Sequence, residues 1–161
     1  MKSHKNDKIP KIEYWHVWTD EEGVSHQDRR VLNDFEQESM GGDAEPQWNN
    51  HLLKSNAKIM FSELPVGWRG SWHENPKPQW IIPLSGKWFV ETMDGHRVEM
   101  GPGDISFGGD QNTKEDDEGR KGHLSGTIGG HPARLMIIQL TDEKWVGAKP
   151  DDLESEEDLD E

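Results

Sequence analysis

Residues 67–86 read GWRGSWHENPKPQWIIPLSG, and this stretch decides the fold. His73 and Asn75 stand two residues apart, and side chains at positions i and i+2 of a β-strand lie on the same face. Two prolines separate this segment from a second apolar run, which begins at Gln79 and ends at the tight-turn dipeptide Ser85-Gly86. The stretch therefore predicts two short strands that present polar side chains on a shared inner face.

The alternation of short apolar runs with turn residues continues through the rest of the chain. Short runs of β-branched and aromatic residues alternate with Gly, Pro and Asp turns, and Asp94-Gly95 is the strongest hairpin signal. No long amphipathic helix is visible, so the sequence predicts an all-β fold of antiparallel strands in a sandwich or barrel. The expected strands are residues 12–19, 24–32, 58–64, 69–74, 79–84, 87–93, 96–100, 105–107, 124–128 and 133–140.

The chain is acidic and contains no cysteine. Its formal net charge is -14, and residues 151–161 contribute eight acidic side chains and no basic one. An acidic surface repels phosphate, and there is no basic stripe with interleaved aromatic residues, so nucleic acid is not an expected partner. Without thiolates, any metal would be held by imidazole, carboxylate or amide oxygen. Eight tryptophans supply large apolar area to a chain that is only 30% hydrophobic.

In residue type and spacing, residues 67–86 resemble the first motif of the cupin superfamily, Gly-x5-His-x-His-x3–4-Glu-x6-Gly. The segments HENPKPQWIIPLSG, ETMDGHRVEMGPGDISF and GDQNT…GRKGHLSG together look like a subgroup of small cupins, and YWHVWTDEEGVSHQ resembles the N-terminal strands of that subgroup. The resemblance covers roughly residues 12–141. It implies a cupin double-stranded β-helix, a jelly-roll-like barrel with little helix and a ligand cavity inside.

The cupin resemblance also implies a pocket formed by His73, Asn75, Gln79 and His123. Asn75 and Gln79 occupy the positions of a usual histidine and glutamate ligand, and we assign His123 to the final histidine of the second motif. Two imidazoles and two amides carry no charge to compensate a divalent ion, which weakens a metal site. Amides and neutral imidazoles instead offer donors and acceptors to a small polar or aromatic molecule.

Two enzymatic alternatives remain open on the same residues. A metal-dependent cupin enzyme of the dioxygenase, isomerase or lyase type would use His73, Gln79 and His123 to hold Fe, Mn, Ni or Zn. A metal-free enzyme would use His73 or His123 as a general base. The other histidines with a strand or loop context are expected at the surface: His16, His26, His96 and His131.

Three regions are expected along the chain. Residues 1–11 are polar and basic and predict a flexible arm, residues 12–141 form the barrel, and residues 142–161 predict an acidic, disordered tail. A short helical turn is expected around residues 48–53. The charged residues 111–120, between Asp110 and Lys121, predict a solvated loop, with a lid over the barrel mouth as the alternative.

The expected setting is a cytoplasmic protein that binds a small molecule. No stretch approaches the length of a transmembrane helix, and the basic N-terminus lacks the apolar region of a signal peptide. We therefore expect no membrane partner. Because many cupins dimerise through N-terminal strands, residues 12–32 are expected to mediate a homodimer.

Overall fold

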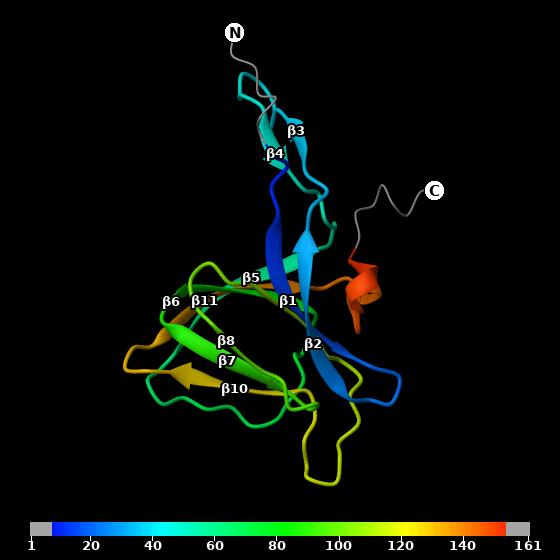
Figure 1. The fold of residues 1–161 in the computed structure, drawn as a ribbon, viewed down its shortest axis with the longest axis vertical. Helices are drawn as coiled ribbons and strands as arrows, with labels where there is room; N and C mark the ends of the chain where they lie inside the picture. The colour runs from blue at the N-terminus through cyan, green and yellow to red at the C-terminus, as the bar shows by residue number, and fades with distance from the viewer. Residues whose placement is uncertain (1–7, 154–161) are drawn as a thin grey trace.

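The computed structural model describes residues 8–153, and strands make up nearly all of its regular structure (Figure 1). The all-β prediction is therefore confirmed. No helix within these residues has the length and apolarity needed to span a bilayer. The strands are β1 (Ile12–Thr19), β2 (Ser25–Leu32), β3 (Glu36–Glu38), β4 (Gln47–Asn49), β5 (Ala57–Leu64), β6 (Gln79–Ser85), β7 (Lys87–Thr92), β8 (Arg97–Met100), β9 (Ser106–Gly109), β10 (His123–Ile128) and β11 (Ala133–Leu140), followed by the 3-10 turns η1 (Glu143–Trp145) and η2 (Pro150–Asp152).

Two sheets form the body of the molecule. The larger has the strand order β2-β1-β9-β6-β11-β5, and the smaller has the order β10-β7-β8. All pairings in them are antiparallel except β1 with β9, which run parallel. Across residues 8–153 the hydrogen-bonded ladders stay in separate sheets, so they do not form one closed barrel.

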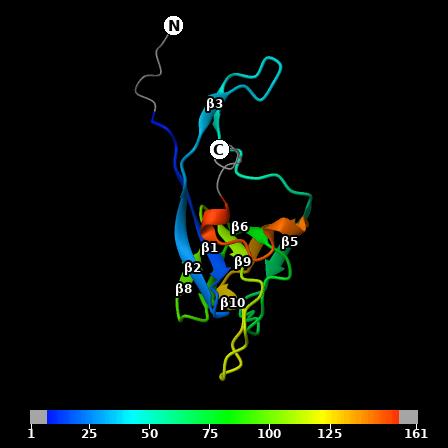
Figure 2. The ribbon, with the colours of Figure 1, turned by 90° about the vertical axis from the view of Figure 1, so that its right-hand side faces the viewer.

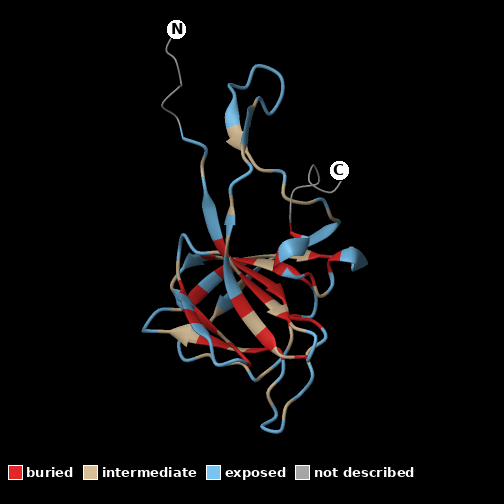
Figure 3. Cartoon of the chain, turned by 45° about the vertical axis from the view of Figure 1, so that its right-hand side comes forward, coloured by how far each residue is buried: buried red, intermediate tan, exposed pale blue. Residues whose placement is uncertain are grey.

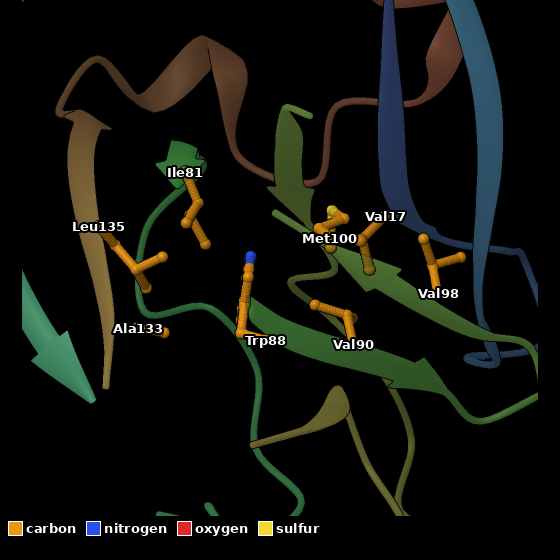
Figure 4. Close-up of a cluster of buried hydrophobic side chains, with 8 residues drawn as sticks. All are labelled: Val17, Ile81, Trp88, Val90, Val98, Met100, Ala133 and Leu135. Carbon is orange, nitrogen blue, oxygen red and sulfur yellow. The ribbon is translucent and has the colours of Figure 1, made fainter. Parts of the chain in front are cut away.

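The main core fills the space between the two sheets. Alternation along β6 directs Gln79, Ile81 and Pro83 inward, where they are buried, and leaves Leu84 exposed. Trp88 of β7 projects from the opposite side into the same apolar cluster, and its ring lies between side chains of both sheets (Figure 4). The cluster contains Val17, Ile81, Trp88, Val90, Val98, Met100, Ala133 and Leu135.

A second core covers part of the outer face of the large sheet. Trp145, Ala148 and Leu153 are buried there against Tyr14 and Phe107. The disordered tail expected for residues 142–161 is therefore wrong for its first part, because residues 142–153 pack on the sheet. The sequence-based expectation missed this because apolar residues are sparse in the acidic run. Residues 154–161 lie outside the described part of the chain, as do residues 1–7 of the expected arm.

Two local expectations are corrected. Residues 48–53 do not form a helical turn, because Gln47–Asn49 is a strand that pairs with β3 in a small hairpin. This hairpin projects away from the two sheets (Figures 1 and 2), and most of it is exposed (Figure 3). Residues 69–74 are not a regular strand. They run along β10 and bridge it at only two positions, Arg69 with Gly126 and His73 with His123.

Candidate functional site

The candidate site begins at the base of a long loop between β9 and β10. Asp110 follows the last residue of β9, and His123 is the first residue of β10, so the two ends of the loop meet. Nδ1 of His123 donates a hydrogen bond of 2.7 Å to Oδ2 of Asp110. Asp110 is fully buried and His123 is 4% exposed. The loop between them is largely exposed and projects from the body (Figure 1), so its charged residues are solvated as expected.

Asn75 occupies the other oxygen of the same carboxylate. Its backbone N–H and its Nδ2 both donate to Oδ1 of Asp110, at 3.0 and 2.8 Å. The Asn75 side chain lies directly against Gly108, where a Cβ atom would stand 2.3 Å from Nδ2. Glycine at this position therefore makes room for the amide beside the carboxylate.

A row of amides extends from Asn75 across the large sheet. Nε2 of Gln79 donates to Oδ1 of Asn75 at 2.7 Å, and Nε2 of Gln139 donates to Oε1 of Gln79 at 2.9 Å. Gln79 and Gln139 are register partners on β6 and β11, so their side chains share the inner face. The donors run in one direction, from Gln139 through Gln79 and Asn75 to Asp110.

The carboxylate sets this direction. An ionised carboxylate only accepts, so Asn75 must turn its NH₂ group toward Asp110 and its oxygen toward Gln79. Gln79 must then donate to Asn75, and its own oxygen is left to accept from Gln139. On the other side, Nδ1 of His123 must carry a proton, which in the neutral ring leaves the lone pair on Nε2. Asp110 thus determines the orientation of His123, Asn75, Gln79 and Gln139.

The pKa of Asp110 is lowered despite its burial. Burial alone raises the pKa of a carboxyl group, but that effect is outweighed by the hydrogen bond from His123, the charge that His123 carries when it is protonated, and the two hydrogen bonds from Asn75. The carboxylate is accordingly ionised at neutral pH, which is the state that the direction of the amide row requires.

His73 lies at the edge of the site. It forms an isolated antiparallel pair with His123, with N–H to carbonyl distances of 3.0 and 2.9 Å, and the two imidazole rings are 4.7 Å apart. Unlike His123, it is exposed, and its Nδ1 donates to the carbonyl oxygen of Ser71 at 2.6 Å. The four residues expected in the pocket thus meet in one region, with three of them buried and His73 on the outside.

The donor set does not fit the usual cupin metal. The amide oxygens of Asn75 and Gln79 each accept a hydrogen bond from a neighbouring amide, and both oxygens of Asp110 are occupied by donors. Two imidazole nitrogens, Nε2 of His73 and Nε2 of His123, are left. In residues 8–153 there is no cluster of three or more His, Asp or Glu side chains that would hold an ion.

Further polar atoms inside the sandwich have no hydrogen-bond partner among the described residues. They are Nε1 of Trp88, Oε1 of Gln27 and Oγ of Ser106, and each of these residues is at most 3% exposed. Gln27 pairs with the core residue Val17, and Ser106 pairs with Ile81, so both side chains face the interior that Trp88 enters. Buried polar atoms are normally satisfied, so these three are groups that a hydrogen-bonding molecule between the sheets would satisfy.

Sequence reasoning missed several residues that organise the site. Asp110 lies in the segment GDQNT…GRKGHLSG that carries the cupin resemblance, but it was given no role in the pocket. Gln139 carries no local motif, because its role depends on β6 and β11 coming together. His16 was expected at the surface but is fully buried, and its Nε2 donates to the carbonyl oxygen of Ala148 at 2.7 Å.

Comparison with known proteins finds no relative of this chain. No protein-family model matches the chain, and no curated protein is similar to it in sequence.

Proposed function

We propose that the chain is a cupin-like β-sandwich that binds a small polar or aromatic molecule beside His123. One observation carries the proposal: Asp110 holds Nδ1 of His123, which leaves Nε2 of a buried imidazole without a partner among the described residues. The motif spacing of residues 67–86 and the two facing, largely antiparallel sheets support the cupin resemblance.

The polar atoms that lack a hydrogen-bond partner indicate which kind of ligand would bind. Nε2 of neutral His123 accepts a hydrogen bond, so it favours a ligand with an O–H or N–H group. Nε1 of Trp88 can only donate, and Trp88 lies four register positions from His123 along the β7–β10 pair, so a ligand that extends that far between the sheets would need a carbonyl or ether oxygen there. The buried charge of Asp110 disfavours a second anion nearby. Together these features support a neutral molecule that has both a donor and an acceptor.

The metal-dependent alternative has weaker support. It would require Gln79 to give up its hydrogen bond from Gln139 before its oxygen could bind an ion together with His73 and His123. The resulting site would contain no carboxylate, because Asp110 lies behind His123 and is fully hydrogen-bonded. A neutral donor set of this kind holds a divalent cation poorly.

The test follows His123 directly by ¹⁵N NMR of histidine-labelled protein. We expect Nδ1 of His123 to carry a proton, as its hydrogen bond to Asp110 requires. The probes are phenol, benzamide and benzoate. We expect the neutral probes, phenol or benzamide, to shift the Nε2 resonance of His123 in a saturable manner, and benzoate to have a smaller effect. The matched control is His131, an exposed histidine outside the site, whose resonances should not move.

Two outcomes would overturn the proposal. The first is an Nε2 resonance of His123 that none of the probes moves, while the protein remains folded by its amide spectrum. The second is a stoichiometric shift of both His73 and His123 on addition of Zn²⁺ or Fe²⁺ that is lost in Gln79→Ala, since this would favour the metal-dependent enzyme.

A further inference from the structure

An apolar strip lies uncovered on the outer face of the large sheet. Phe61 and Ile59 on β5 are 69% and 59% exposed, and Leu84 at the end of β6 is 50% exposed. The register places Phe61 beside Met136 of β11, and Met136 beside Ile82 of β6, so these side chains form one continuous row. A single exposed apolar residue is ordinary, but a contiguous row across three strands marks an interaction surface.

On the same face, the C-terminal segment covers part of the next row of side chains. The adjacent row of the sheet runs from Ile59 through Ile138 to Trp80. Ile138 and Trp80 pack into the second core with the C-terminal residues Trp145 and Leu153. The C-terminal segment therefore covers the half of the face near β6 and β9, and it leaves the half near β5 bare.

The free edge of the sheet adjoins this strip. β5 is the last strand of the large sheet, and within the described residues only β11 pairs with it. It is eight residues long and reads AKIMFSEL, with no proline and with charges only near its ends, at Lys58 and Glu63. Natural proteins normally protect such an edge with charges, prolines or bulges. This edge has no such protection in its centre.

We propose that a second copy of this chain binds at this edge, by antiparallel pairing of β5 with β5 about a two-fold axis, so that the exposed strips of the two copies adjoin. Pairing centred on Met60 sets Ile59 of each copy opposite Phe61 of the other, on the same face, an aromatic with β-branched pair formed twice. In this register Lys58 of each copy stands opposite Ser62 of the other, and Glu63 opposite Ala57, so no like charges are opposed. In-register parallel pairing would set Lys58 beside Lys58 and Glu63 beside Glu63. The two large sheets then become one continuous sheet.

The two segments outside the described residues, 1–7 (MKSHKND) and 154–161, are polar and charged, so neither is a good occupant for the strip. Residues 154–161 read ESEEDLDE, and their charges make them a poor cover for Phe61, Ile59 and Leu84. The interface also differs from the one expected at the sequence level, since β1 and β2 lie at the opposite edge of the sheet from β5.

The test is the mass of the full-length protein in solution by light scattering at about 50 µM, where an obligate pair is associated. We expect twice the chain mass of 18.5 kDa for the unaltered protein and for Met40→Lys, a matched control whose 67% exposed residue lies on the projecting β3–β4 hairpin. Phe61→Lys and Ile59→Lys should each give the mass of one chain. Because both side chains are more than half exposed, these variants should keep the far-UV circular dichroism of the folded protein.

Three results would overturn the proposal. One is an unaltered protein with the mass of a single chain. Another is a dimer that survives both Phe61→Lys and Ile59→Lys. The third is a dimer that is dissociated by Val31→Lys, a 44% exposed position on β2, and not by the β5 variants, because it would move the interface to the N-terminal strands.

Discussion

Nδ1 of His123 and Oδ2 of Asp110 are 2.7 Å apart, and this hydrogen bond joins the two ends of a loop whose other residues are largely exposed. The pair thus closes the loop and orients the site at once. A buried carboxylate that accepts from a ring nitrogen fixes which nitrogen keeps its lone pair. The remaining oxygen of Asp110 orders Asn75 and, through it, the amide row.

Asp110→Asn should destabilise the fold and disorder the site. An asparagine has one acceptor and one donor group, so it cannot accept from both Asn75 and His123. One buried donor is then left unpaired, and we expect a loss of roughly 2–4 kcal/mol in the free energy of unfolding by urea denaturation. The control is Asp117→Asn on the exposed part of the same loop, which should change stability by less than about 0.5 kcal/mol. Equal stabilities for the two variants would contradict a central role for Asp110.

Gly108 and Asn75 should be energetically coupled. In Gly108→Ala the new Cβ would overlap the Asn75 amide, and we expect a cost of roughly 1–3 kcal/mol. Asn75→Ala alone should cost roughly the same, because it removes the Nδ2 donor from Asp110 and the Oδ1 acceptor from Gln79. In the double variant the small side chain at position 75 leaves room for alanine at position 108. The cost of the double variant should therefore be smaller than the sum of the two single costs by about 1 kcal/mol or more. Strict additivity in urea denaturation would show that the two residues act independently.

The strands were predictable because their signals are local. Asp94-Gly95 predicts its hairpin from two adjacent residues, and β7 and β8 pair around that turn. The two-residue period of β6 likewise indicates that Gln79 and Ile81 face the core. These features depend on neighbours in the chain, so one sequence contains enough information to predict them.

The organisation of the site was not predictable, because it depends on contacts between distant residues. Asp110 lies 35 residues from Asn75 and 13 from His123 in the chain, and no spacing rule relates the three. The docking of residues 142–153 was missed for a related reason. Its apolar anchors Trp145 and Leu153 are separated by charged residues without a regular period, so the segment reads as solvated until its receiving surface is known.

Protonation of His16 should lower the free energy of unfolding as the pH falls. Burial lowers the pKa of His16 to about 4, against an ordinary value of 6.5. Between these values the unfolded chain binds a proton that the folded chain excludes, so the free energy of unfolding rises with pH across this window. The stability contributed by the neutral ring is lost as the pH falls from 6.5 toward 4. The difference amounts to roughly 3 kcal/mol from this group. His16→Gln keeps a donor for Ala148 but does not titrate, so its stability should depend less on pH over the same window, as measured by urea denaturation.

His26 should give the opposite dependence. Its two ring nitrogens contact Asp20 at 2.7 Å and Asp94 at 3.0 Å, and it thereby links the β1–β2 turn to the β7–β8 turn. Partial burial lowers the pKa of His26, but the hydrogen bonds and charges of the two carboxylates outweigh that effect and raise it overall. The folded state then binds the proton more tightly than the unfolded state. The stability that protonated His26 contributes is therefore fully present below pH 6.5 and is lost as the pH rises through the raised pKa.

His26→Gln should therefore reduce the free energy of unfolding more at pH 5.5 than at pH 8.5. His131→Gln, at an exposed position away from both turns, provides the control and should leave the pH dependence unchanged. A loss of stability in His26→Gln that is the same at both pH values would mean that the ring contributes through its stacking on Trp18, at 4.9 Å between centroids, and not through its charge. The same comparison in 0.5 M salt should shrink the difference between the two pH values to less than half, since the carboxylate contacts are only partly buried and salt screens them.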